Sequence, residues 1–537
     1  MLTTLLTPWT ITLSLLTLYL LRRHLRNRQH TTAAARLHCK PPPTYPISTP
    51  NPLGLAVLYE FYKADQVSEV EEVTRRQLNQ LSSKHGRDVT TFKINMLGDE
   101  TVVTADEENI HAVLVSQFSD FELGPYRCEG FRPLLGEGIF ATDGPKWAHS
   151  RAMLKPQFTR TQMSDLALEE RHIDRLMAAL PADKDGDGWT SHADFRTLFH
   201  HYTLDSAMEM LLGVTSETKG FDTGMSGEMD WERLTHCVDL SLSMIATRLL
   251  LGPLYWVYDT REFRECRGEV FGFVDRCVTS ALEAQAQEKE KDEKEVGGAE
   301  EEEKSRYILL HALAKETQDP IELREQMLNV LLAGRDTTAA FLSYLVILLA
   351  RHPRVYAKLR AEVLAKFGSS ISSTKTEISF YSLRSCTYLQ HTLSETARLY
   401  PLVPATKRQA SVNTTLPRGG GPDGRSPIYL RKGQDVVYDT HTLHRSKRIW
   451  GDNAEEFYPE RWEGWKVGRE YIPFSAGPRI CVGQQLALTK AAYFAVRLVQ
   501  RFDRMEDLNA ENRIRCKVAL GNSPADAVAL RLREARD

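Results

Sequence analysis

One cysteine, Cys481, stands in a loop whose composition suits metal binding. The loop runs from Pro473 to Gly483, and an apolar pattern typical of one helix face follows it, at Ala491, Phe494, Leu498 and Phe502. Free amides and the macrodipole at a helix start favour a thiolate, and glycines on both sides of the cysteine allow close backbone approach. The residue types therefore predict a thiolate that binds a metal.

The surroundings of Cys481 limit which metal that is. Zinc and iron–sulfur sites need several Cys or His ligands, but no other cysteine lies within thirty residues of Cys481. A single thiolate suits the axial position of haem iron, because the porphyrin supplies the equatorial bonds. Arg479 is placed to pair with a haem propionate. The alternative is a buried thiol that packs as a small hydrophobic side chain.

The loop resembles the haem-binding signature of the cytochrome P450 superfamily, in its eukaryotic microsomal form. The matching positions are Phe474, Gly477, Arg479, Cys481 and Gly483. The resemblance implies that Phe474 packs against the proximal haem face and that Cys481 is the fifth iron ligand. It also implies haem b (iron protoporphyrin IX) as the cofactor and a mainly α fold with small β-sheets, of the α+β class.

A long helix is predicted in the second half of the chain. Asp319 is a suitable N-cap, Pro320 suits the first position, and Glu322 stands three residues after the cap. Pro353 stops the helix near Arg351. A helix of this length is expected to cross an entire domain.

The middle of this helix carries the sequence Ala-Gly-Arg-Asp-Thr-Thr from Ala333. Gly and Thr cost helix stability, and the Thr337 hydroxyl can bond the Ala333 carbonyl and bend the helix. The segment matches the oxygen-activation motif of P450 monooxygenases, so the resemblance implies that Asp336 and Thr337 deliver protons. The alternative is a packing helix that is kinked by its threonine.

Glu395 and Arg398 stand three apart, which alone is typical of a surface ion pair. Because Arg461 follows at the spacing of a second arginine in the superfamily, the resemblance implies that these three residues form a buried network that braces the cysteine loop. Trp147 and Arg151, four apart, share one helix face. The resemblance assigns both to a haem propionate, and Arg408 is a further candidate for a propionate.

Composition indicates a globular protein without a bias toward nucleic acid. The 537 residues have a formal net charge of −3, and 42% are hydrophobic. Eight cysteines are scattered without paired spacing, which favours a reducing compartment over a disulfide framework.

The N-terminus predicts a membrane anchor at residues 1–21. The run from Leu2 to Leu21 has no charge and is about long enough to cross a bilayer, and several arginines follow it. This order predicts a single-pass protein of the endoplasmic reticulum membrane with a cytosolic catalytic domain. A cleaved signal peptide is the alternative, but its basic cluster would precede the apolar run. Residues 22–50 are predicted as a basic, Pro-rich linker and 51–537 as the haem-thiolate monooxygenase domain.

Three further segments have predicted conformations. Residues 92–96 and 101–104 have the composition of a β-hairpin. The charged run at 288–304 has no apolar period and is predicted as a solvated loop. The Gly-rich stretch at 415–424 is predicted as a turn and lacks the context of a phosphate loop.

The Gly-rich stretch and the two P450 motifs resemble the fungal branch that hydroxylates n-alkanes and fatty acids. Ser475 and Val482 depart from the Asn and Leu expected in that branch. The prediction is O2-dependent hydroxylation of an apolar aliphatic substrate, with electrons from NADPH through a separate cytochrome P450 reductase. The alternatives are a P450 that tailors a polyketide or terpenoid intermediate of secondary metabolism, and a haem-thiolate carrier or redox-neutral isomerase. Membrane lipid is an expected contact, and nucleic acid is not.

Overall fold

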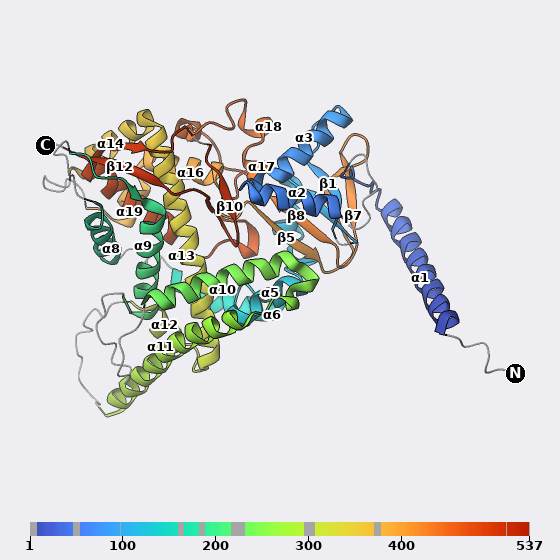
Figure 1. The fold of residues 1–537 in the computed structure, drawn as a ribbon, viewed down its shortest axis with the longest axis horizontal. Coiled ribbons are helices and arrows are strands. Elements are labelled where there is room, and N and C mark those ends of the chain that lie inside the picture. The colour runs from blue at the N-terminus through green and yellow to red at the C-terminus, as the bar shows by residue number, and fades with distance from the viewer. Residues whose placement is uncertain are drawn as a thin grey trace. The chain divides into compact units, whose positions relative to one another are not determined.

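A computed structural model describes residues 8–46, 54–96, 98–158, 166–181, 188–215, 231–294, 307–369, 377–511 and 513–535. The chain divides into two compact units (Figure 1). The first comprises Met1–Glu60, Thr74–Glu122 and Lys407–Asp439, and the second comprises Phe61–Val73, Leu123–Thr406 and Thr440–Asp537. The mainly α composition with small sheets agrees with the predicted α+β class.

The first unit is built around a five-stranded sheet with the order β1-β2-β8-β5-β3. β1 and β2 form the predicted antiparallel hairpin, and β2 continues parallel to β8. β-branched and aromatic residues such as Phe92 and Val102 bury one face of the hairpin. The elements are α2 (Leu55–Gln66), α3 (Val73–His85), α4 (Glu107–His111), β1 (Thr91–Met96), β2 (Asp99–Thr104), β3 (Phe121–Glu122), β5 (Ala405–Ala410) and β8 (Asp435–Asp439).

The first part of the Gly-rich stretch is a strand, and the predicted turn is found only at its end. β6 (Thr414–Gly420) pairs antiparallel with β7 (Ser426–Leu430), and the turn is confined to the residues between them. A Cβ at Gly420 would lie 2.3 Å from the Lys40 carbonyl oxygen. The glycine therefore permits a close backbone approach inside the strand.

The N-terminal helix α1 (Pro8–Arg36) continues through the arginines that were predicted to begin a linker. The first seven residues of the predicted anchor lie outside the described residues. Two segments of the described chain are apolar and long enough to span a membrane, Trp231–Val257 and Pro320–Arg351, and α1 is not one of them. Because 72% of the apolar window in Pro320–Arg351 is buried, the length of that helix reflects a core position.

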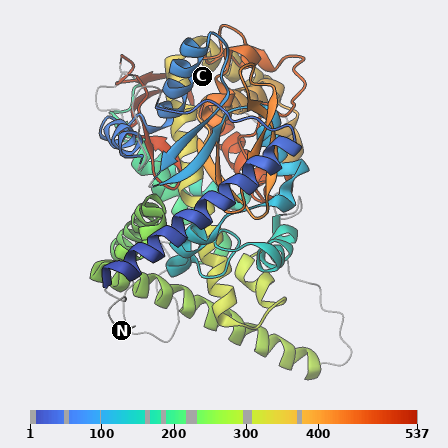
Figure 2. The same cartoon turned by 90° about the vertical axis from the view of Figure 1, so that its right-hand side faces the viewer.

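The second unit is organised around α13 (Pro320–Arg351), against which α9 and α11 pack (Figures 1 and 2). Its other helices are α5 (Pro125–Leu135), α6 (Gly144–Leu154), α8 (Ala167–Ala178), α9 (Phe195–Leu212), α10 (Trp231–Leu251), α11 (Arg261–Lys294), α12 (Leu309–Ala314), α14 (Pro353–Phe367), α15 (Phe380–Arg384), α16 (Thr387–Leu399), α17 (Thr440–His444), α18 (Lys447–Trp450) and α19 (Gln484–Arg501). Its strands are β4 (Ala193–Asp194), β9 (Phe502–Asp507), β10 (Cys516–Val518), β11 (Asn522–Pro524) and β12 (Ala529–Glu534).

The local signals that predicted α13 are confirmed at both ends. The Asp319 carboxylate accepts hydrogen bonds from the amides of Ile321 and Glu322, and α14 begins at Pro353. A reciprocal capping box does not form, because the Asp319 amide donates to the Thr317 hydroxyl instead of to Glu322. The helix therefore has the predicted start, but a different side chain completes its cap.

Two hydrophobic cores meet along α13. Its first half supplies Leu323, Leu328 and Leu331 to one core, and its second half supplies nearly every residue from Ala339 to Ala350 to the other. Between the two cores the helix is accessible at Gly334. The turn of α13 that contains Asp336 and Thr337 thus lies where the core packing is interrupted.

Two predictions from composition and period need correction. α11 extends to Lys294, so residues 288–294 of the charged run are helical, and residues 295–306 lie outside the described part. α19 carries the predicted apolar face at Ala491, Phe494 and Leu498 but ends at Arg501, so Phe502 begins β9. Periodicity alone did not distinguish the last helical residue from the first strand residue.

Candidate functional site

The cysteine loop is held by short-range backbone bonds. The Cys481 amide donates to the Phe474 carbonyl oxygen over 3.0 Å, and the Ile480 amide donates to that of Gly477 over 3.0 Å. Gly477 and Ser475 have positive φ angles, 68° and 63°. Asn adopts this conformation more readily than other non-glycine residues, which gives a physical reason for the Asn expected where Ser475 stands.

All eight cysteines lie in the described part of the chain, and only the side chain of Cys481 is exposed. The thiol was expected to have a lowered pKa, but desolvation raises its pKa, while the amides of Gly483 and Gln484 and the Arg151 cation oppose the rise. A thiol that is surrounded by protein and still has accessible surface is expected to line a cleft. This thiol would fit a metal ligand whose proton would leave when a metal binds.

Trp147, Arg151 and Arg479 gather beside this loop. The Arg479 guanidinium carbon lies 4.4 Å from the centroid of the Trp147 ring, and that of Arg151 lies 5.9 Å from it. Arg151 also donates to the Ile480 carbonyl oxygen over 3.0 Å. Two cations that flank one indole next to an exposed thiol form a donor set suited to a group that carries carboxylates.

Asp143 is a partner of this cluster that the sequence did not predict. Its carboxylate accepts a hydrogen bond of 2.6 Å from Arg479 and bonds of 3.0 Å from the Leu123 amide. An Asp before Gly144-Pro145 is typical of an N-cap, but Asp143 makes no cap bond to α6. The sequence therefore indicated a helix cap, whereas the Asp143 side chain accepts a hydrogen bond from Arg479, 336 positions away.

The structure places Phe474 and Arg408 in different units. Phe474 is half-buried in the cysteine loop of the second unit. Arg408 belongs to the first unit, where it is buried and its guanidinium carbon lies 5.7 Å from the ring centroid of Tyr438. Its assignment to a propionate stays a prediction, as does the contact of Phe474 with haem.

The bend predicted in α13 has the expected hydrogen bond. The Thr337 hydroxyl donates to the Ala333 carbonyl oxygen over 2.6 Å. A Cβ at Gly334 would meet nothing within 4 Å, so the turn beside Thr337 borders open space. Asp336 is partly exposed and lies next to a buried cation, because its Oδ1 is 3.5 Å from the Arg335 guanidinium.

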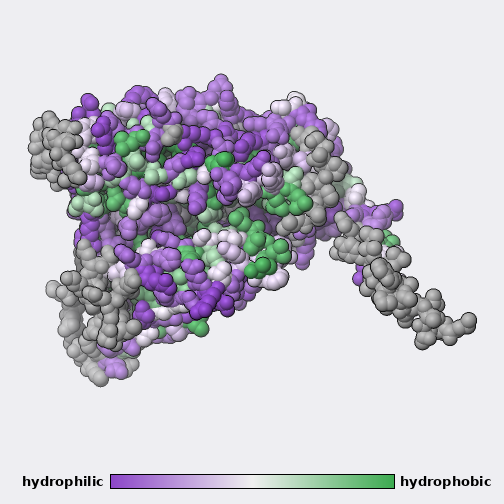
Figure 3. All heavy atoms as spheres, viewed as in Figure 1, coloured by the Kyte–Doolittle hydropathy of each residue, from purple (hydrophilic) through white to green (hydrophobic). Residues whose placement is uncertain are grey.

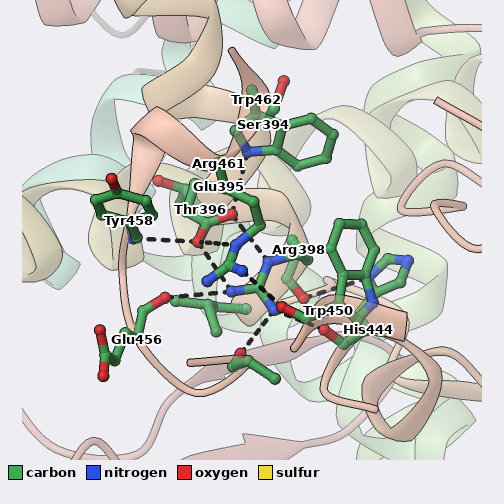
Figure 4. Close-up of polar contacts among 12 residues, drawn as sticks. Ser394, Glu395, Thr396, Arg398, His444, Trp450, Glu456, Tyr458, Arg461 and Trp462 are labelled. Atoms are coloured by element: carbon green, nitrogen blue, oxygen red, sulfur yellow. Dashed lines mark hydrogen bonds and ion pairs between the residues drawn. The ribbon is translucent and has the colours of Figure 1, made fainter. Parts of the chain in front are cut away.

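Glu395, Arg398 and Arg461 form one buried cluster in the second unit (Figure 4). Glu395 lies on α16 with 0% of its side chain exposed and accepts 2.8 Å and 2.9 Å bonds from Arg398. Arg461, from the 3₁₀ helix η6 (Pro459–Trp462), donates to the same carboxylate over 3.2 Å. The indole of Trp462 and the Tyr458 amide also donate to Glu395. Because every charge has an opposite partner, burial of this cluster is tolerable.

His444 connects this cluster to the residues that precede the cysteine loop. Arg398 donates to the His444 carbonyl oxygen over 2.7 Å, and the Ile472 amide donates to the His444 ring Nε2 over 3.0 Å. Burial, together with the Arg398 charge, lowers the pKa of His444 to about 3, so the ring is neutral and can accept this bond. No pattern in the sequence around His444 predicts that its ring is buried and accepts a hydrogen bond from Ile472.

Comparisons with known proteins agree on one family. The cytochrome P450 family model matches residues 52–527. The chain is 42% identical over 510 residues to cytochrome P450 monooxygenase g430 of Fusarium sp, which covers 94% of this chain and 86% of that protein. It is 41% identical over 464 residues to cytochrome P450 52A10 of Candida maltosa, with 84% and 85% covered.

A third relative extends this agreement. Cytochrome P450 monooxygenase alt2 of Alternaria solani is 37% identical over 491 residues, which are 89% of this chain and 88% of the relative. The match to the family model and these long alignments agree with the arrangement of the cysteine loop and α13. The chain therefore belongs to the cytochrome P450 family and is a monooxygenase of that family.

Proposed function

We propose that this protein hydroxylates an apolar aliphatic chain, such as that of a fatty acid or an n-alkane. The observation that carries the proposal is an apolar cavity beside the Asp336–Thr337 turn. It has a volume of about 20 Å³ in this structure and is lined by Leu134, Leu135, Val238, Ser241, Leu242, Val270, Leu328, Leu331, Leu332 and Arg335. Leucine side chains favour an alkyl chain over a polar substrate, because its burial gains free energy in proportion to apolar area.

Family membership implies a haem whose iron is bound by a cysteine thiolate. We assign the thiolate to Cys481 and the propionate contacts to Trp147, Arg151 and Arg479, with Arg408 as a further partner and Phe474 as packing on the proximal side. Bound haem supplies the activation of O2. The accessible thiol and the two arginines beside it support this assignment.

The residues of the chain control protons and substrate position. Thr337, tied to the Ala333 carbonyl, holds a hydroxyl at the accessible turn of α13, and Asp336 supplies a carboxylate next to it. In the proposed reaction these two groups hold and pass protons, and the leucines of the cavity orient the alkyl chain and exclude water. Glu395, Arg398 and Arg461 keep the segment before the cysteine loop in place.

We assign electron supply to NADPH through a separate cytochrome P450 reductase, as the resemblance to microsomal members implies. We also propose that the protein lies at the endoplasmic reticulum membrane with its catalytic domain in the cytosol. An exposed apolar patch at the end of α10 and in the 3₁₀ helix η5 (Gly252–Val257) supports membrane contact. It consists of Leu250, Leu254, Trp256 and Val257, and apolar spheres gather over this part of the surface (Figure 3).

Reconstitution with reductase, NADPH and dodecanoic acid or dodecane tests the proposal. The wild-type protein should form an alcohol of the alkyl chain, which gas chromatography with mass spectrometry detects. Failure to hydroxylate either chain, with oxidation of a polyketide or terpenoid instead, would favour the tailoring alternative. Product formation without O2 or NADPH consumption would favour the isomerase alternative.

Cys481→Ser tests the thiolate assignment separately. It should abolish the absorbance band of the reduced carbon monoxide complex that is characteristic of thiolate-bound haem. Cys39→Ser is the matched control, because it removes another partly accessible thiol without affecting the loop. An unchanged band in Cys481→Ser would end the assignment of the ligand.

A further inference from the structure

Four charged or titratable side chains from three helices meet beside the Asp336–Thr337 turn. His200 comes from α9, Asp239 from α10, and Arg335 and Asp336 from α13. The Arg335 guanidinium lies 2.5 Å from the Asp239 carboxylate and 3.5 Å from that of Asp336. His200 Nδ1 lies 3.8 Å from Asp336 Oδ1. The sequence motif at residues 333–338 contains Asp336, but no sequence pattern indicates His200.

Several atoms of this cluster are buried without a hydrogen-bond partner in the described part of the chain. They include His200 Nδ1 and Asp336 Oδ1, which face each other, and Arg335 Nε. A buried polar atom without a partner is costly, and a native structure has few of them. A separation of 3.8 Å is slightly too long for a hydrogen bond, and neither atom is accessible to water, so a small rotation of the Asp336 carboxylate is needed to bring the two atoms into direct contact.

The chemistry of the four side chains differs in a way that singles out His200. Arg335 holds its proton at all physiological pH values and cannot pass it on. Asp239 is 57% exposed and is occupied by Arg335. Desolvation and the positive charges of Arg335 and Arg196 lower the pKa of His200, against the opposing effect of Asp336 and Asp239. A neutral imidazole can accept a proton at one nitrogen and donate at the other.

We propose that His200 is a positioning residue that returns protons directly to Asp336 after a small rotation of the carboxylate. The inference rests on the proposed role of Asp336 in proton delivery. A proton from solvent first binds the ring at Nε2 and forms the imidazolium, the Nδ1–H bond then breaks, and its proton passes to Asp336 Oδ1, which leaves a neutral ring protonated at Nε2. No electron moves in this step, and the number of protons is conserved.

His200→Gln tests the proposal, because glutamine keeps a polar side chain of similar reach but cannot titrate. His201→Gln is the matched control, since His201 is the next residue on α9 and is exposed. In the haem-loaded protein with reductase, His200→Gln should lower the coupled turnover by about tenfold, which is less than the roughly 10²–10⁴-fold effect of a direct general acid or base, because His200 acts through Asp336. It should also flatten the pH profile below about pH 6.5, because the surroundings of His200 lower its pKa from that value, and raise the peroxide formed per NADPH. His201→Gln should match the wild type in all three measurements.

A titration provides a readout that does not depend on turnover. Proton NMR of the histidine rings in the reduced carbon monoxide complex gives the pKa of His200 in wild type and in Asp336→Asn. The pKa should fall in the variant, because the carboxylate that stabilises the imidazolium is gone. An unchanged pKa would refute the coupling even if His200→Gln failed to fold.

The two proposals fail in different ways. Equal turnover, pH profile and peroxide yield in His200→Gln and His201→Gln, in a wild-type protein that binds haem and hydroxylates its substrate, would overturn only the role of His200. A wild-type protein without haem, or without hydroxylation, would overturn the proposed function itself.

Discussion

Replacement of Glu395 by Gln should destabilise the second unit strongly. The carboxylate has 0% exposure and accepts hydrogen bonds from Arg398, Arg461, Tyr458 and Trp462. Glutamine has nearly the same shape, so packing is preserved, but its neutral amide leaves two buried guanidinium groups without a counter-charge. Its NH2 group would also face the donors of both arginines.

The cost follows from the burial of this cluster. Loss of one partner from a buried ion pair costs about 3–5 kcal/mol, a large part of the roughly 5–15 kcal/mol that stabilises a typical domain. With an unfolding entropy of about 2.1 cal/mol/K per residue, a P450 body of this size has about 1 kcal/mol/K, so Tm should fall by about 3–5 °C. A larger fall is expected if unfolding is confined to the second unit.

Thermal unfolding of the haem-loaded protein, followed by circular dichroism and by the Soret absorbance, measures this effect. Glu506→Gln is the matched control, because it removes an exposed ion pair with Arg531 whose side chains are 47% and 42% exposed. Such a surface pair contributes about 0–1 kcal/mol. If Glu395→Gln and Glu506→Gln melted within 1 °C of each other, the argument that the buried charges depend on Glu395 would be refuted.

Three further predictions concern other parts of the chain. Thr337→Ala should keep haem bound but lower the product formed per NADPH by about tenfold, while the peroxide yield rises. Ser343→Ala, which removes a similar 2.8 Å bond to a carbonyl on α13, should leave both yields unchanged. Equal product per NADPH in the two variants would contradict the role of Thr337. Burial raises the pKa of Glu71 from 4.5 to about 7, so its contribution favours folding at low pH and is lost as pH rises to about 7. Glu71→Gln should therefore raise the free energy of unfolding by about 3 kcal/mol at pH 8 and by little at pH 4, as measured by urea unfolding. An equal rise at both pH values would count against this pKa. Trp256→Ser should weaken binding to phospholipid vesicles by about tenfold in a sedimentation assay. Val467→Ser is the control, because Val467 is similarly exposed but lies outside the patch, and it should leave vesicle binding unchanged.

The sequence predicted what depends on neighbours along the chain. Asp319 and Pro353 marked the ends of α13, and the Thr337 bond to Ala333 spans only one helical turn. The hairpin of β1 and β2 followed from two short β-rich runs with a turn between them. These elements were predictable because their stabilising contacts lie a few residues apart.

Some predictions from local composition were wrong, because a distant contact or the extension of an existing helix determined the conformation. The Gly-rich segment was predicted as a turn, but Gly420 lies in β6 because its missing side chain lets the Lys40 backbone pass. The charged residues after Glu288 prolong α11 to Lys294, since Glu and Lys are good helix formers and need no apolar face to continue a helix already formed. The pKa of the Cys481 thiol was misjudged because desolvation depends on atoms far away in the sequence.

The sequence alone was enough to identify the family, because the motifs at the cysteine loop and at residues 333–338 can be recognised from neighbouring residues alone. The tertiary structure decided which side chains surround those motifs. Asp143 reaches Arg479, His444 reaches the Ile472 amide, and His200 reaches Asp336. None of these pairs shares a local period, so only the tertiary packing of the second unit brings such groups together.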